Sequence, residues 1–145
     1  MSLNFQHLGI NVIVSVVITI LTVGVQPASA QSNRGYDEVN LTQGKELYAQ
    51  HCAVCHGKNG ESTVKDWHQR DTNGRFPPPP LNGTAHTWHH SFGALMHTIQ
   101  NGTQENGGGM PAWKETLSNE EIFSIIMWIT SLWPDEIFAA WMQRN

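Results

Sequence analysis

The 145-residue chain has only two cysteines, and both lie in the run Cys52-Ala53-Val54-Cys55-His56. No other thiol competes for their chemistry. The C-x-x-C-H run is the attachment signature of c-type haem. On a helix the two thiols lie three residues apart on one face, where they can reach two vinyl groups of one haem edge. The motif therefore predicts one covalently bound haem c, attached through Cys52 and Cys55, with His56 as a ligand of the iron.

Charge is also missing from the start of the chain, where no Lys, Arg, Asp or Glu occurs before Arg34. Residues 8–25 are almost all apolar or small, and Ala28-Ser29-Ala30 has the small-x-small pattern of a signal-peptidase site. We therefore expect residues 1–30 to be a signal peptide cleaved after Ala30, which makes the protein periplasmic or otherwise exported. The apolar stretch approaches the length of a membrane span, so a retained membrane anchor remains an alternative.

The part that follows the leader lacks convincing strands and lacks a basic surface. The formal net charge of −4 excludes a nucleic-acid footprint. A thioredoxin-like C-x-x-C follows a strand in a βαβ unit, whereas the approach to Cys52 has a helical pattern, so a redox disulfide is disfavoured. Zinc would need further ligands from the histidines, and the adjacency of Cys55 and His56 has no special merit for a tetrahedral site.

We expect a flexible polar segment over residues 31–39, followed by a helix capped by Thr42. Four residues share one face of that helix: Gly44, Leu47, Tyr48 and His51. Alanine at Gly44 would favour a helix by about 1 kcal/mol. Either this glycine is incidental, or another helix approaches the backbone closely there.

Two further helices have clear start and stop signals. Ser118 and Glu121 form a capping box before an isoleucine stripe that Pro134 terminates. A short further turn is expected over residues 134–143. In the middle of the chain, Ser91 is a candidate N-cap and Asn101-Gly102 a C-terminal stop, with Met96 on the core side of the helix between them.

The iron needs a sixth ligand or an open site, and Met110 is the best candidate. Gly107-Gly108-Gly109 gives a loop that can lie close to a flat ligand, and Pro111 favours an extended backbone at Met110. A methionine that merely fills a gap is the alternative interpretation. The remaining rivals as ligands are His86, His89, His90 and His97.

Together these motifs resemble class I cytochrome c, a family of single-haem electron carriers. The matching runs are residues 44–48, residues 52–57, Met110-Pro111 and residues 128–132. The resemblance implies an all-α cytochrome c fold over residues 40–145, in which three to five helices with long loops surround one haem. It also implies that Gly44, Tyr48 and Trp128 meet where the first and last helices cross.

The resemblance further implies that a proline carbonyl accepts a hydrogen bond from His56, and Pro80 is the expected counterpart. It implies an electron carrier and not an enzyme. The carrier would exchange single electrons with redox protein partners in transient complexes. An electron-accepting cytochrome subunit of a dehydrogenase or another redox complex remains the alternative. Residues 58–76 form a longer segment than the family needs, and a second metal at His86, His89 and His90 is left open.

Overall fold

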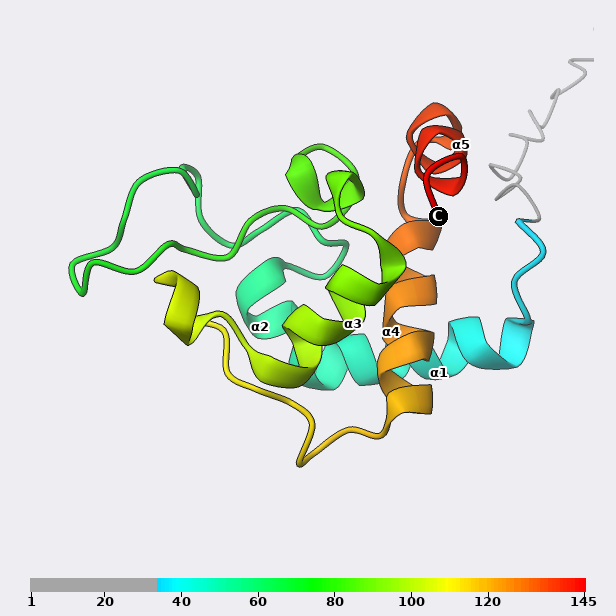
Figure 1. Cartoon of the computed structure of the whole chain (residues 1–145), viewed down its shortest axis with the longest axis horizontal. Coiled ribbons are helices and arrows are strands. Elements are labelled where there is room, and N and C mark those ends of the chain that lie inside the picture. The colour runs from blue at the N-terminus through cyan, green and yellow to red at the C-terminus, as the bar shows by residue number, and fades with distance from the viewer. Residues whose placement is uncertain (1–33) are drawn as a thin grey trace, which may run out of the picture.

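The computed structural model describes residues 34–145, so the predicted leader lies outside the described residues. Five α-helices follow one another in this part: α1 (Glu38–His51), α2 (Ala53–His56), α3 (Phe92–Asn101), α4 (Asn119–Ser131) and α5 (Asp135–Met142). Two 3-10 turns, η1 (His86–His89) and η2 (Gln104–Asn106), lie in the long connections between α2 and α4 (Figure 1). Within residues 34–145 the only β-type pairing is one isolated bridge. The predicted all-α fold is confirmed.

Helix α1 begins earlier than the sequence predicted. It starts at Glu38, and the N-cap is Asp37, whose side chain accepts a hydrogen bond from the backbone of Val39. Thr42 therefore lies inside the helix. Residues 38 and 39, which were assigned to the flexible segment, belong to its first turn.

Helices α1 and α4 cross in close contact and form the centre of the fold (Figure 1). A Cβ atom at Gly44 would overlap the backbone carbonyl of Ser124, so the glycine is needed for the close approach. Tyr48 is buried beside the crossing at 1 % exposure. Trp128 contacts α1 through Lys45, whose Nζ lies 5.5 Å from the indole centroid. The crossing predicted from the family resemblance is therefore present.

The helices of the second half begin where the sequence predicted. Ser91 caps α3 by accepting from the Ala94 amide, and Ser118 and Glu121 form the complete capping box of α4. The apolar stripe of α4 makes half of the buried core, which comprises Tyr48, Leu117, Ile122, Ile125, Ile126, Ile129, Trp133 and Trp141.

Two tryptophans near the C-terminus fix the loops that lead into α3. The indole N–H of Trp133 donates to the carbonyl of Leu81 at 2.7 Å, and that of Trp141 donates to the carbonyl of His90 at 2.7 Å. Helix α5 thereby packs against the η1 region rather than extending away from the domain.

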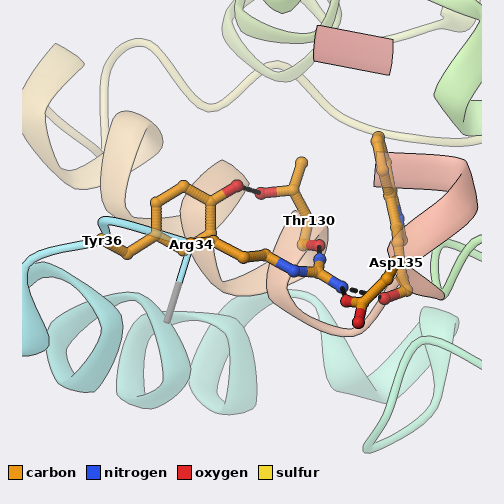
Figure 2. A network of polar contacts seen from close by, with 5 residues as sticks. Arg34, Tyr36, Thr130 and Asp135 are labelled. Atoms are coloured by element: carbon orange, nitrogen blue, oxygen red, sulfur yellow. Dashed lines mark hydrogen bonds and ion pairs between the residues drawn. The ribbon is translucent and has the colours of Figure 1, made fainter. Parts of the chain in front are cut away.

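The segment before α1 is bound to the far end of α4 (Figure 2). The Arg34 guanidinium donates to the carbonyls of Thr130 and Trp133, both at 2.5 Å, and pairs with Asp135 at 2.8 Å. The hydroxyl of Tyr36 lies 2.7 Å from Thr130 Oγ1. Arg34 thus gives the Trp133 carbonyl, just beyond α4, a charged partner and adds a second type of bond to the Thr130 carbonyl, which also accepts from the Trp133 amide. None of the helices within residues 34–145 is long and apolar enough to cross a membrane.

Candidate haem-binding site

One turn of helix presents both cysteines. Cys52 is the C-cap of α1 and donates its N–H to the Tyr48 carbonyl, while its own carbonyl accepts from the amides of Cys55 and His56. Cys52 is half-buried and Cys55 is exposed, and both are free thiols. Val54, between them, is 78 % exposed. The two thiols therefore lie at the protein surface, where a ligand edge can reach both.

The acidity of Cys52 does not suit a redox disulfide. Burial, with a smaller effect of Cys55, raises the pKa of the Cys52 thiol to about 11. Reactive C-x-x-C motifs instead depend on a cysteine whose pKa is lowered. The described residues also contain no strand before the motif. These observations argue against disulfide exchange.

His56 is held in the form that binds a metal. The side chain is buried, at 8 % exposure, and its Nδ1 lies 3.0 Å from the Pro79 carbonyl oxygen. A carbonyl can only accept, so Nδ1 carries the hydrogen and Nε2 keeps its lone pair. Burial lowers the pKa of His56, although the bond to Pro79 opposes this in part. The imidazole is therefore neutral near pH 7, with Nε2 available as a ligand.

The prediction that Pro80 accepts this bond was wrong by one residue. The acceptor is Pro79, and the Pro80 carbonyl instead accepts from Thr87 Oγ1 at 3.1 Å. The register is set after the prolines, where the amide of Leu81 donates to the Gly60 carbonyl at 2.6 Å. Prolines have no N–H groups whose hydrogen bonds could set the register of the run. The proline run itself therefore does not show which carbonyl faces His56.

Backbone contacts tie the motif to its surroundings. The buried Tyr48 hydroxyl donates to the Gly57 carbonyl at 2.8 Å. The amide of Ser62 donates to the His56 carbonyl at 2.7 Å, and Thr63 Oγ1 donates to that of Cys55 at 2.8 Å. No sequence motif predicts these three contacts, because two are made by hydroxyl groups at ordinary spacings and the third joins two backbone groups.

Met110 lies half-buried at the end of a closed loop. Its carbonyl accepts from the Thr103 amide at 3.0 Å, and its own amide donates to Thr103 Oγ1 at 3.1 Å. Gly108 donates to the Thr103 carbonyl at 2.9 Å. A Cβ at Gly102 would lie 2.6 Å from the Met110 carbonyl oxygen, so the two segments are in close contact. Thr103, which the sequence did not single out, therefore fixes the backbone of Met110 from both sides.

The rival histidines have other neighbours. His97 Nδ1 lies 3.1 Å from the Asn101 side-chain nitrogen, and His89 stacks on Trp88 with ring centroids 3.9 Å apart. His86 stacks on Trp67 at 5.1 Å and meets the edge of His90 at 5.5 Å. Within residues 34–145 no three His, Cys, Asp or Glu side chains are grouped so as to hold a metal ion. The second metal site left open by the sequence gains no support.

The apolar surroundings also suit a porphyrin. Seven large apolar side chains in the segments between α2 and α4 pack against the core yet stay partly exposed: Leu81, Trp88, Phe92, Leu95, Met96, Ile99 and Trp113. Side chains of this kind cover the flat faces of a large apolar ligand. The two thiols and the neutral histidine form a donor set that fits haem c.

Comparison with known proteins agrees with this chemistry. The family model described as "Cytochrome C oxidase, cbb3-type, subunit III" matches residues 39–129. The chain belongs to this family. The match contains the C-x-x-C-H motif, Met110 and the crossing residues of α1 and α4, and it confirms the resemblance to the cytochrome c family. Membership implies haem c as the cofactor and electron transfer as the general role.

Two relatives are cbb3-type cytochrome c oxidase subunits CcoP. That of Azospirillum brasilense is 28 % identical over 101 residues, which cover 70 % of this chain and 31 % of the relative. That of Rhodobacter capsulatus is 29 % identical over 124 residues, covering 81 % and 35 %. A thiosulfate dehydrogenase of Stutzerimonas stutzeri is 28 % identical over 119 residues, covering 77 % and 36 %. The chain thus spans about a third of the length of these relatives.

Proposed function

We propose that this protein is a monohaem c-type cytochrome that passes single electrons between redox proteins, with His56 and Met110 as the two axial ligands. The observation that carries the proposal is the buried, neutral His56, oriented by Pro79 directly after two free thiols at attachment spacing. One C-x-x-C-H run and no further cysteine support a single covalent haem.

The haem, when bound, supplies the one-electron iron couple. His56 offers Nε2 to the iron, and its Nδ1–H bond to Pro79 raises the basicity of that ligand. Met110 offers a soft thioether, which favours the reduced metal and raises the potential. Two protein ligands leave no position for a substrate, so this ligation supports a carrier rather than an enzyme. Val54 and the attachment residue Cys55 lie exposed, so a partner protein can approach this edge of the site.

We further propose that the protein is exported, with residues 1–30 removed, and that it meets its redox partners transiently. The apolar leader and the Ala28-Ser29-Ala30 site support this. N-terminal sequencing of the protein purified from its host tests it. A first residue at or near Gln31 is the expected result, whereas an intact Met1 in the membrane fraction would replace export by a retained anchor.

A role as an electron-accepting subunit of a larger redox complex is the second candidate. It is supported by relatives whose names are those of an oxidase subunit and of a dehydrogenase. The two candidates differ in the size of the native particle. A haem-containing species of the mass of one chain in gentle extracts favours the carrier, and co-migration with larger subunits favours the complex.

Intact mass and axial spectroscopy test the site. The purified protein should carry the mass of one haem, and its oxidised form should show a methionine–iron charge-transfer band. Met110→Ala should abolish that band, while Met142→Ala, at a residue that is 53 % exposed, should leave it unchanged. A chain without added mass would overturn the haem proposal. A band that persists in Met110→Ala would overturn only the axial assignment.

A further inference from the structure

The long segment after the haem motif is bonded to the loop that carries Met110. The amide of Phe76 donates to the Gly107 carbonyl at 2.9 Å, and Phe76 forms an isolated parallel bridge with Gly108. In Figure 1 this segment projects from the helices on the side where η2 lies. Residues 58–76 therefore have a definite contact at their C-terminal end.

Arg70 reinforces this contact with its guanidinium group. Its Cζ lies 3.8 Å from the centroid of the Phe76 ring, and its Nη1 donates to the Gly74 carbonyl at 2.6 Å. A Cβ at Gly107 would lie 3.1 Å from Arg70 Nη1, so the guanidinium lies directly against the glycine. Gly107 also has a φ of 77°, a conformation that favours glycine. Arg70 thus contacts both sides of the junction.

The turn that holds Arg70 and Phe76 is itself well ordered by hydrogen bonds. Asp71 Oδ1 accepts from the amides of Asn73 at 2.8 Å and Arg75 at 2.9 Å. These bonds, led by the one from Arg75, hold the pKa of Asp71 below its usual value. The carboxylate therefore stays charged, and the turn keeps its shape, at neutral pH.

The base of the same segment is bonded to the histidine side of the site. Ser62 donates its amide to the His56 carbonyl at 2.7 Å and its hydroxyl to the Pro78 carbonyl at 2.8 Å. Residues 58–76 therefore connect the segment of one proposed axial ligand to the loop of the other.

We propose that Arg70 and Phe76 form a latch that keeps the Met110 loop closed, with Arg70 acting as a positioning residue for the Met110 thioether. The inference rests on the proposed His56 and Met110 ligation. An external ligand reaches the iron only when the loop opens, so its apparent affinity is scaled by the population of the open form. A contact that exists only in the closed form lowers that population, and its removal raises the apparent affinity.

Imidazole binding to the oxidised, haem-loaded protein measures the open population. Arg70→Ala should raise the apparent affinity for imidazole by about two- to fivefold, the factor expected for one partly exposed cation–π contact. Arg70→Lys keeps the charge but loses the planar stack, so it should lie between Arg70→Ala and the native protein. Lys65→Ala removes a positive charge from the same exposed segment and serves as the matched control, with native affinity.

Amide hydrogen exchange on the same haem-loaded samples provides a second readout that does not depend on the sixth ligand. Exchange of the peptides that contain residues 76 and 107–110 should accelerate in Arg70→Ala and stay native in Lys65→Ala. Native exchange or native imidazole affinity in Arg70→Ala would overturn the latch, even where the methionine band is present. Absence of that band from the unmodified protein would instead overturn the axial assignment, and the role of Arg70 with it.

Discussion

Gly44 of α1 lies directly against the backbone carbonyl of Ser124 in α4, so closely that a single added methyl group would overlap it. The two backbones, rather than two side chains, set the distance between the helices. The buried side chains of Tyr48 and the α4 isoleucines are arranged around this contact.

Gly44→Ala should therefore destabilise the fold despite the better helix propensity of alanine. We expect the free energy of unfolding to fall by about 1–3 kcal/mol, the usual cost of overpacking, as measured by urea denaturation. Gly93→Ala is the matched control, since this helical glycine in α3 has nothing within 4 Å of an added Cβ. It should be neutral or stabilising by up to about 1 kcal/mol. Equal effects of the two changes would contradict the crossing.

The hydroxyl of Tyr48 links α1 to the haem motif. Burial raises the pKa of Tyr48, so the phenol remains a donor to Gly57 across the neutral range. Tyr48→Phe leaves the buried Gly57 carbonyl without this partner and should lower the free energy of unfolding by about 1–3 kcal/mol. Tyr36→Phe removes a less buried hydroxyl contact and should cost less in the same urea experiment. The reverse order would show that the Tyr48 bond contributes little.

Thr103 should control how firmly Met110 is held. Thr103→Val deletes the hydroxyl that accepts from the Met110 amide and leaves the backbone bond between the same residues in place. We expect imidazole to displace the sixth ligand of the oxidised protein more readily, by about two- to tenfold, from the loss of one hydrogen bond. Thr103→Ser retains the hydroxyl and should behave like the native protein. If imidazole bound Thr103→Val with native affinity, the Thr103 hydroxyl would not contribute to holding the Met110 loop.

Arg34 should stabilise the end of α4 more than its ion pair alone suggests. Its side chain is 8 % exposed, whereas that of Asp135 is 74 % exposed. Arg34→Ala removes charge-assisted bonds to two carbonyls and should cost about 1.5–3 kcal/mol, measured by thermal or urea unfolding. Asp135→Asn weakens an ion pair whose acidic partner is exposed and should cost less than about 1 kcal/mol. If the two variants were equally destabilised, the carbonyl contacts would not be the main contribution.

Before haem is bound, the stability of the domain should decrease on acidification because of the free His56 imidazole. Burial lowers the pKa of this residue in the fold, so the unfolded chain, whose histidine titrates near about 6.5, binds the proton more strongly. The His56 contribution is therefore complete above that pH and is lost as the pH falls below it, with a slope of up to about 1.4 kcal/mol per pH unit. Urea midpoints between pH 8 and pH 5 measure this. A free energy of unfolding that rises on acidification through this window would contradict the assignment.

The sequence predicted those features that depend on neighbouring residues. Ser91 and Ser118 were found because an N-cap acts on amides two or three residues away, and α3 and α4 begin where expected. The start of α1 was missed because Asp37 and Thr42 are both good caps, and nothing local decides between them. The segment that leads into Asp37 is held by contacts of Arg34 with Thr130 and Trp133, which lie almost at the opposite end of the sequence. Such contacts cannot be read from the residues near Asp37.

The site was predictable to the same extent. Five adjacent residues define the attachment motif, and a glycine run next to Met110 indicates a loop. The carbonyl that accepts from His56 was predicted one residue too late, at Pro80 instead of Pro79. The register of the proline run depends on the hydrogen bond from Leu81 to Gly60, which the sequence does not reveal. The bond from Met110 to Thr103 and the contact of Arg70 with Phe76 could not be predicted, because each depends on the fold and has no periodic or spacing signature.

The crossing of α1 with α4 also constrains the order of events during synthesis. Its partners Gln43 and Ser124 are 81 positions apart in the chain, so α1 gains its packing partner only after most of the polypeptide has been made. Cys52, Cys55 and His56 leave the ribosome well before that point. His56, which the completed fold buries, is therefore accessible to a modifying enzyme for an interval before α4 arrives, whereas Cys55 stays exposed afterwards.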